Sequence, residues 1–356
     1  HSPRPPHPWN LQPWVMWGAV AAFAGPPVVY AWMGALKAMR RLEAPADMTQ
    51  PRFQNADLEG AGPVPAAVEE GGTPRELAVV LVSNGGTEVS DAVLPYAILQ
   101  ESGRYNVVCV APRKEPCYLW PGLVLHPDHD FDGLAVRYPQ GPAVVVLPNF
   151  LDYENPELLQ WLQATTRAGN IGGRAVLLCI CEGARTAAAA GLLDGRSATT
   201  HWSALPSLRG QYRDTQWLQH VRFAVDGGDG EVITSAGVTT AADATLALLD
   251  LHQGRSVAEA TAHRLGMQLR PVAQRAQGLS LREVVGTALS AAFQPLWRRR
   301  RWGVLIYEGV DEVQVAAWLD CSHRLFVASA VSVGAGDRVV RSKRGLMLQP
   351  MEDSSS

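Results

Sequence analysis

Two of the five cysteines in this sequence lie close together, in the stretch "RAVLLCICEGARTAAAAGLL" (174–193). Cys179 and Cys181 end an apolar run typical of a strand, and Glu182 and Gly183 open a stretch of small residues typical of a helix. A thiolate is a strong nucleophile, and a tight turn from a strand into a helix pushes its residue outward while the helix N-terminus stabilises negative charge. The pattern therefore predicts a nucleophile at Cys181 and a core residue at Cys179.

All five thiols are expected to be reduced. Cys179 and Cys181 would point to the same face of a strand, but a bond between such near neighbours would be strained. The odd number of cysteines and the absence of any CxxC pair argue against a disulfide framework and against a structural zinc site. We expect no metal and no cofactor.

Short apolar runs that alternate with helical patterns indicate how Cys181 is positioned. The expected strands lie at 77–83, 105–111, 143–149, 174–181 and 231–237, and Val and Leu dominate them. Near-continuous apolar strands alternating with helices are typical of a parallel sheet covered on both faces. The sequence thus predicts one doubly wound, mostly parallel α/β domain at 76–266, with flanking helices and ligands bound at the carboxyl edge of its sheet.

The segment "CEGARTAAAAGLLDGRSATTHW" (181–202) resembles the nucleophile elbow of the ThiJ/PfpI family, within the class I glutamine amidotransferase-like superfamily. The branch with isonitrile hydratases and AraC-type amidotransferase-like domains is nearest, and "VITSAGVTTAADATLALLDL" (232–251) is similar to the same branch. The resemblance implies a flavodoxin-like fold, Cys181 as the reactive cysteine, Asp91 as the acid beside it, and His201 near the pocket. The alternatives are an ordinary helix acid for Asp91 and a hydrogen-bonded core or interface residue for His201.

Two departures from the family pattern affect the expected pocket. Where the family commonly has Pro-Gly-Gly, this chain has Pro148-Asn149-Phe150, so the N–H groups of Phe150 and Glu182 would form the oxyanion hole. The bulky Phe150 ring is expected to enter the pocket wall. Asn149 and Gly183 complete the expected pocket, with Gly183 letting the chain pass close behind the sulfur. A Glu182 carboxylate could act as an acid or base, or could oppose ionisation of the thiol by repulsion.

Two functions remain open at this stage. The first is a cysteine-dependent hydrolase, hydratase or amidotransferase-like enzyme that acts on an electrophilic carbon of a small molecule. The second is a redox or ligand-sensing module without turnover. The net charge of -3 gives no reason to expect a nucleic-acid partner, and a homodimer is expected.

The N-terminal part predicts a membrane anchor. After a flank at 1–13, residues 14–36 carry no charge, have aromatic residues near both ends, and precede Lys37, Arg40 and Arg41. This pattern predicts a single transmembrane helix with the following domain on the cytoplasmic side, and residues 37–75 form a flexible linker. A signal sequence, or a buried hairpin at Pro26-Pro27, is the alternative.

The C-terminal part partly repeats the start of the domain. A helical connector is expected at 267–301, ending in four arginines that cap a helix or contact anionic lipid. In 302–350, "VLIYEGVDEVQVAAWL" (304–319) aligns with "VLVSNGGTEVSDAVLP" (80–95), and "GLMLQP" (345–350) aligns with "GLVLHP" (122–127). A partial duplication explains two ordered blocks better than the generic likeness of strand-helix-strand units. Val315 replaces Asp91, so this part is interpreted as a structural or dimer-completing unit.

Overall fold

The computed structural model describes residues 75–167, 175–227, 231–237, 240–270, 300–324, 328–336 and 338–354, which all belong to one compact unit. In these ranges, no helix combines the length and the apolar character needed to cross a bilayer. The segments predicted as the N-terminal flank, the transmembrane helix and the linker lie outside the described residues, except for Arg75. The connector is described only at its two ends.

A seven-stranded sheet forms the centre of the domain, in the order β11-β12-β8-β7-β1-β3-β6. All neighbours pair in parallel except β11 and β12. After removal of the edge strands β11 and β6, the order is that of a flavodoxin-like doubly wound sheet. The strands are β1 (Glu76–Leu81), β3 (Tyr105–Ala111), β6 (His129–Asp130), β7 (Val144–Leu147), β8 (Val176–Ile180), β11 (Phe223–Asp226) and β12 (Val232–Ser235).

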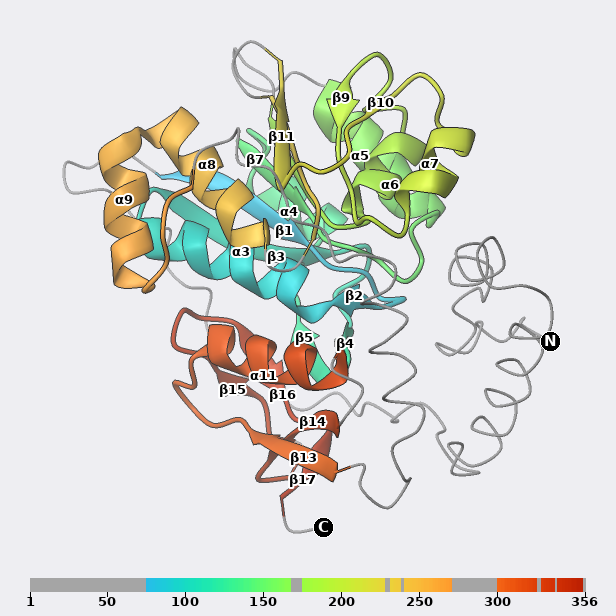
Figure 1. The fold of residues 1–356 in the computed structure, drawn as a ribbon. Coiled ribbons are helices and arrows are strands. Elements are labelled where there is room, and N and C mark those ends of the chain that lie inside the picture. Colours follow the sequence, from blue (N-terminus) through green and yellow to red (C-terminus); the bar gives the residue numbers. More distant parts are fainter. Residues whose placement is uncertain are drawn as a thin grey trace, which may run out of the picture. The chain divides into compact units, whose positions relative to one another are not determined.

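Helices cover both faces of this sheet, as the near-continuous apolar strands require (Figure 1). On one face lie α3 (Val89–Ser102), α8 (Ala241–Gln253) and α9 (Arg255–Arg264), and on the other α4 (Phe131–Arg137), α5 (Pro156–Arg167) and α6 (Gly183–Ala189). The helix α7 (Leu205–Gln211) lies in the chain between β9 (Ser197–Ala198) and β10 (Gln216–Trp217), and these two short strands pair with each other. The predicted doubly wound α/β fold is confirmed.

The C-terminal unit, here residues 300–354, has its own sheet in the order β13-β14-β17 and one helix. Its elements are β13 (Arg300–Leu305), α11 (Glu312–Arg324), β14 (Ala328–Gly334), β15 (Val340–Arg341), β16 (Met347–Gln349) and β17 (Glu352–Asp353). Because β13 begins at Arg300, the expectation that Arg300 and Arg301 end a helix is wrong: both form the first pairs with β14.

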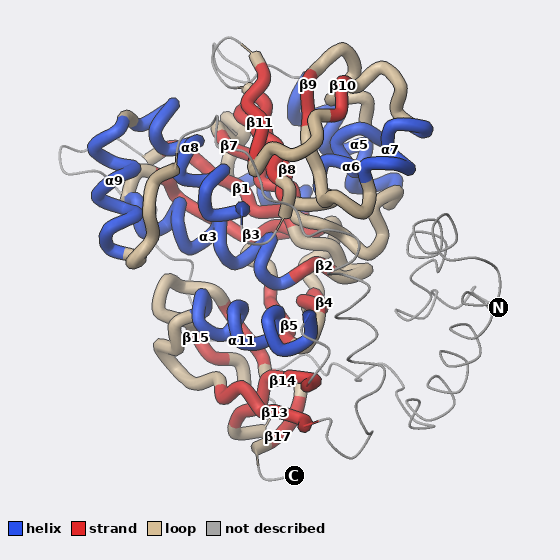
Figure 2. The backbone as a smooth tube through the Cα atoms, viewed as in Figure 1, coloured by secondary structure: helices blue, strands red, loops and turns tan. Residues whose placement is uncertain are grey.

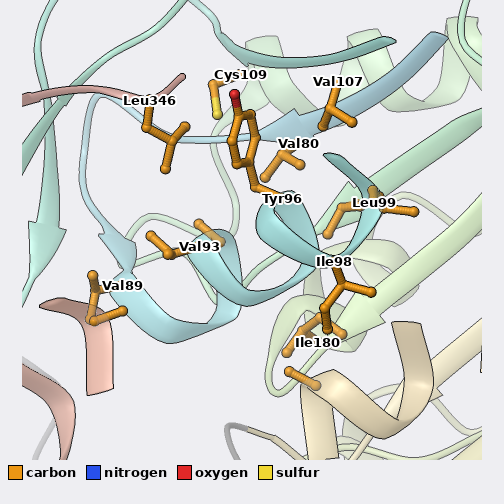
Figure 3. Packing of buried hydrophobic residues seen from close by; sticks show 14 of the residues in the cluster. Val80, Val89, Val93, Tyr96, Ile98, Leu99, Val107, Cys109, Ile180 and Leu346 are labelled. Atoms are coloured by element: carbon orange, nitrogen blue, oxygen red, sulfur yellow. The ribbon is translucent and has the colours of Figure 1, made fainter. Parts of the chain in front are cut away.

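A five-stranded sheet joins the C-terminal unit to the domain (Figure 2). Its order is β15-β16-β5-β4-β2, where β2 (Thr87–Glu88), β4 (Cys117–Trp120) and β5 (Leu123–His126) belong to the domain. The apolar core is also shared. Leu346 of the C-terminal unit lies near Tyr96 and Cys109 in the same buried cluster as Val80 and Val93 (Figure 3). Full burial of one such side chain contributes about 1.5–3 kcal/mol.

Candidate functional site

Cys181 lies at the turn between β8, which ends at Ile180, and α6, which begins at Gly183. Its φ angle is 57°, and among the described residues only His220 shares a positive φ without being glycine. A left-handed conformation costs an L-residue about 1–2 kcal/mol, and such strain persists only where the surrounding structure holds it. The Cys181 residue is 5% exposed, so only a small molecule could reach its sulfur without rearrangement.

Cys179 has a different environment, although it is only two residues away. It is fully buried in the cluster that contains Leu147 and Leu177, and desolvation raises the pKa of its thiol. Cys181 belongs to the other cluster, together with Ile180. The expectation that both cysteines share one face is wrong, because the strand ends at Ile180 and the positive φ turns Cys181 away.

Gly183 is required by the close approach of α6 to β7. A Cβ atom at this position would overlap the carbonyl oxygen of Leu147, the last residue of β7. Gly183 was expected to make room behind the sulfur; its nearest neighbour is in fact this carbonyl. The glycine therefore lets the helix start directly after the turn and so fixes where Cys181 lies.

The loop that carries His201 is tied to the turn by hydrogen bonds. The Thr200 hydroxyl donates to the carbonyl oxygen of Cys181 at 2.8 Å, and the Thr199 N–H donates to the Thr234 hydroxyl at 2.8 Å. His201 Nδ1 lies 2.7 Å from Ser203 Oγ, which orients the imidazole ring. These contacts hold the His201 loop between the end of β8 and the end of β12.

Gly237 brings the cysteine and the histidine to one small space. Its φ is +116°, and the point that a Cβ would occupy lies 3.1 Å from Cys181 Sγ and 3.4 Å from His201 Cδ2. Of the imidazole ring, Cδ2 is thus the atom that lies beside this point. Any larger residue at 237 would press on both groups, so glycine at this position lets the two side chains approach each other.

Asp91 is fully buried in the first turn of α3. Its N–H donates to the Glu88 carboxylate at 2.6 Å, which caps the helix, and its own Oδ2 accepts the N–H of Asn149 at 3.3 Å. The predicted acid is therefore bonded to the loop after β7, which holds two of the expected pocket residues. A buried carboxyl group with a backbone donor is held in one position and suited to exchange a proton with a neighbour.

The loop after β7 is fixed by an isolated bridge between Thr87 and Phe150. Around it, the Glu88 N–H donates to Asn149 O at 2.9 Å and the Leu151 N–H donates to Gly86 O at 3.0 Å. The Phe150 ring is buried in the cluster that contains Cys179, not in the one that contains Cys181. The expectation that the Phe150 ring enters the pocket wall is therefore wrong: the ring packs away from the sulfur, and the backbone of Phe150 is the part relevant to the pocket.

The charge of Glu182 is offset by a neighbouring arginine. Glu182 Oε2 lies 2.6 Å from the Arg185 guanidinium, which also lies over the Tyr153 ring at 4.7 Å from its centroid. Because the carboxylate is paired in this way, it repels a thiolate at Cys181 less than an isolated carboxylate would.

Four residues that shape the site were not predicted from the sequence: Arg185, Thr200, Ser203 and Gly237. The first two and Gly237 lie within the two segments that carried the family resemblance, and Ser203 follows directly. Their spacing was visible, but their contacts depend on three strand ends meeting at one edge. Among the described residues, no group of three or more His, Cys, Asp or Glu side chains could hold a metal ion.

The geometry defines a doubly wound α/β domain with a cysteine at a strained strand-to-helix turn. Residues 77–251 match the model of the DJ-1/PfpI family, and this part of the chain is a DJ-1/PfpI domain. The family expected from the elbow segment is thus confirmed.

Several known proteins are similar to parts of the chain. The HTH-type transcriptional regulator CdhR of Pseudomonas aeruginosa is 35% identical over 130 residues, which are 36% of this chain and 36% of that protein. The match thus spans about a third of the length of that relative. Solved structures include a ThiJ/PfpI family protein from Pseudomonas syringae (22% identity, TM-score 0.49, covering 68% of this chain and 95% of that one) and Drosophila melanogaster DJ-1beta (21%, 0.46, 55% and 99%). An AraC family transcriptional regulator from Pseudomonas putida is 17% identical, with a TM-score of 0.44, and covers 54% of this chain and 100% of that one.

Proposed function

We propose that Cys181 is the nucleophile of a hydrolase, hydratase or amidotransferase-like enzyme that acts on an electrophilic carbon of a small molecule. The observation that carries the proposal is the convergence of Cys181 Sγ and the His201 ring edge beside Gly237, at a strained turn. Strain of this kind is typical of functional positions, and glycine at 237 lets the sulfur and the imidazole ring approach each other.

In the first half of the reaction, the sulfur attacks a carbonyl, nitrile or isonitrile carbon and forms a C–S bond. The negative charge that develops on the attacked group is stabilised by the backbone N–H groups of Phe150 and Glu182. In this scheme Asp91 takes the thiol proton and returns it to the substrate, while the His201 ring orients the substrate.

With an amide substrate, the C–N bond of the adduct breaks and the amine leaves with the returned proton, whereas a nitrile or isonitrile adduct loses no group. In the second half, water adds to the carbon, the C–S bond breaks, and the thiol regains its proton. The product is the hydrated or hydrolysed molecule, so no oxidant or reductant is needed. Pairing of Glu182 with Arg185 favours this route because it offsets a negative charge close to the thiolate.

The test is turnover of a panel of small amides, nitriles, isonitriles and aldehydes by the full chain. We expect at least one to be converted, and Cys181→Ser to abolish the conversion. Cys179→Ala and Cys321→Ser are matched controls, a buried and an exposed cysteine that should both retain it. Conversion that survives Cys181→Ser would refute the proposal.

A sensing module without turnover is the second candidate. The likeness to a protein named as a transcriptional regulator favours it. In this case peroxide oxidises the thiol to sulfenic acid and is reduced to water, and a second equivalent gives sulfinic acid. Intact-mass measurement would then show one or two added oxygens, lost in Cys181→Ser, with no turnover of any panel member.

Membrane anchoring through residues 14–36, with the domain on the cytoplasmic side, completes the proposal. The uncharged run and the positive charges at Lys37, Arg40 and Arg41 support it. Expressed in full, the chain should sediment with membranes and resist extraction at alkaline pH. Release by alkaline extraction alone would contradict it.

A further inference from the structure

The pairing of β5 with β16 is two-fold symmetric when residues are matched by the alignment of the two repeated segments. The sequence alignment of 122–127 with 345–350 makes Leu125 and Leu348 equivalent, and in the structure these two residues are direct partners. On either side, His126 pairs with Met347 and Val124 pairs with Gln349. His126 is equivalent to Gln349, and Met347 is equivalent to Val124, so each of these two pairs is the counterpart of the other. A two-fold symmetric interface has this property, because every contact occurs twice with the roles of the two sides exchanged.

The helices obey the same relation. α3 and α11 occupy equivalent places in the aligned segments, and they pack against each other. Ala92 and Ala316, which are equivalent, are both buried in the one cluster that spans the two parts. The Ser90 hydroxyl also donates to the Asp320 carboxylate at 3.2 Å, which links the two helices directly.

Polar contacts across this boundary are buried and specific. His126 Nε2 lies 2.8 Å from Gln349 Oε1, and these residues occupy the same repeat position. Arg344 is bonded to Glu101 of α3 at 3.0 Å and to Glu312 of α11 at 3.0 Å, and its carbonyl accepts the Tyr96 hydroxyl at 3.0 Å. A boundary with a continuous apolar core and buried polar pairs is typical of a permanent interface.

We propose that the face of the DJ-1/PfpI domain formed by α3, β4 and β5 is a self-complementary interface, and that the C-terminal unit is its built-in partner. The unit occupies the place that a second copy of the chain would take. The full chain therefore does not use this face to form a homodimer, and the homodimer expected from the sequence would need another surface.

This partner is connected to the site without contributing a reactive group. β2 ends at Glu88, the residue that caps α3 at Asp91, and β2 and β16 belong to the same five-stranded sheet. At the position equivalent to Asp91 the C-terminal unit has Val315, which is buried. The C-terminal unit thus supports the segment that carries Asp91, and it supplies no second acid at the equivalent position.

The experiment uses the full chain with Leu125→Cys and Leu348→Cys, in a background with Cys117→Ser and Cys321→Ser. These two changes remove the native thiol that pairs with position 125 across β4 and β5, and the exposed thiol. Paired residues of an antiparallel ladder lie within the Cα separation that a disulfide accepts. After oxidation of a mixture of unlabelled and isotope-labelled chains, we expect a bond between 125 and 348 within single chains, at the mass of one chain. Leu125→Cys alone is the matched control.

Bonds between labelled and unlabelled chains would overturn the proposal, as would folded protein in which the two cysteines do not react. If the buried leucine substitutions prevent folding, Ser90→Cys with Asp320→Cys replaces them, since these residues are partners on the two helices. The same single-chain bond is expected, and bonds between chains again contradict the proposal. Neither readout depends on activity, so failure here is distinct from failure of the proposed function.

Discussion

The first unit of the domain, residues 76–126, and the C-terminal unit have the same order of strand, helix and strand but different surroundings. β1 pairs on both sides, with β3 and β7, whereas β13 is an edge strand within the described residues. The equivalent leucines show the effect: Leu81 is fully buried and Leu305 is 55% exposed. The site therefore depends on elements that the two units do not share, namely β7, β8 and the turn at Cys181.

Residues shared by the two units can also have different roles. Glu88 and the equivalent Glu312 are both buried. The Glu88 carboxylate accepts the Asp91 N–H, whereas the Glu312 carboxylate is paired with Arg344. The C-terminal unit has thus kept residues that pack and has none of the groups that the proposed chemistry uses.

The largest expected effect comes from the cysteine that has no equivalent in the C-terminal unit. In a Cys321→Ser background, iodoacetamide should label Cys181 before the other three buried thiols, those of Cys109, Cys117 and Cys179, because burial raises the pKa of each of these three. Cys181→Ser should abolish this fast labelling together with turnover. Peptide mapping by mass spectrometry identifies the labelled site, and fast labelling at any of the other three would contradict the expectation.

The second largest effect is expected at the position where the first unit has Asp91 and the C-terminal unit has Val315. Asp91→Asn should reduce turnover by about 10²–10⁴-fold, because the amide cannot exchange the proton. The reciprocal change Val315→Asp should add no activity and should destabilise the fold by at least about 1–3 kcal/mol, since it buries a polar group without a designed partner. Turnover and urea unfolding measure the two effects.

Asp132→Asn is the matched control for the acid, because Asp132 is an exposed carboxylate in the first turn of α4. It should leave turnover unchanged. Equal losses in Asp91→Asn and Asp132→Asn would mean that the position on α3 has no special role.

The symmetric leucine pair should respond equally from either side. Leu125→Ala and Leu348→Ala should each destabilise the chain by about 2–5 kcal/mol, because both side chains are buried. The double variant should lose less than the sum, since the two leucines are neighbours. Urea denaturation gives the free energies. Leu162→Ala, buried under the opposite face of the sheet, is the additive control.

The smallest effect concerns the one titratable residue in the pair at 126 and 349. Burial lowers the pKa of His126 from 6.5, so the unfolded chain takes up its proton first. Stability should therefore fall as the pH drops below about 6.5, and His126→Gln should weaken this fall. Melting temperatures at pH 7.5 and pH 5 test it.

Asp128 acts in the opposite direction, because burial raises the pKa of this carboxyl to about 6 and protonation then favours the folded state. Since Asp128 is present in both proteins, the difference between wild type and His126→Gln isolates the histidine. If the melting temperature fell by the same amount from pH 7.5 to pH 5 in wild type and in His126→Gln, the role given to His126 would be contradicted.

Much of the fold was readable from the sequence because buried parallel strands leave near-continuous Val and Leu runs. The central strands β1, β3, β7, β8 and β12 all lie where such runs were found, and Cys181 was expected at its turn from the absence of a loop before Gly183. The direction of the Phe150 ring and the pairing of Glu182 with Arg185 could not be predicted. Both depend on which face of the sheet a loop enters and not on any local pattern.

The pairing of equivalent positions also explains why His126 can oppose Gln349. Two identical subunits must carry the same residue at a symmetric contact, so a histidine there would meet a second histidine and both would resist burial together. When both sides of the interface belong to one polypeptide, this restriction is removed, because the residues at 126 and 349 can be substituted independently. The imidazole and the amide, 2.8 Å apart, form a contact between unlike residues that no exact dimer could make at this position.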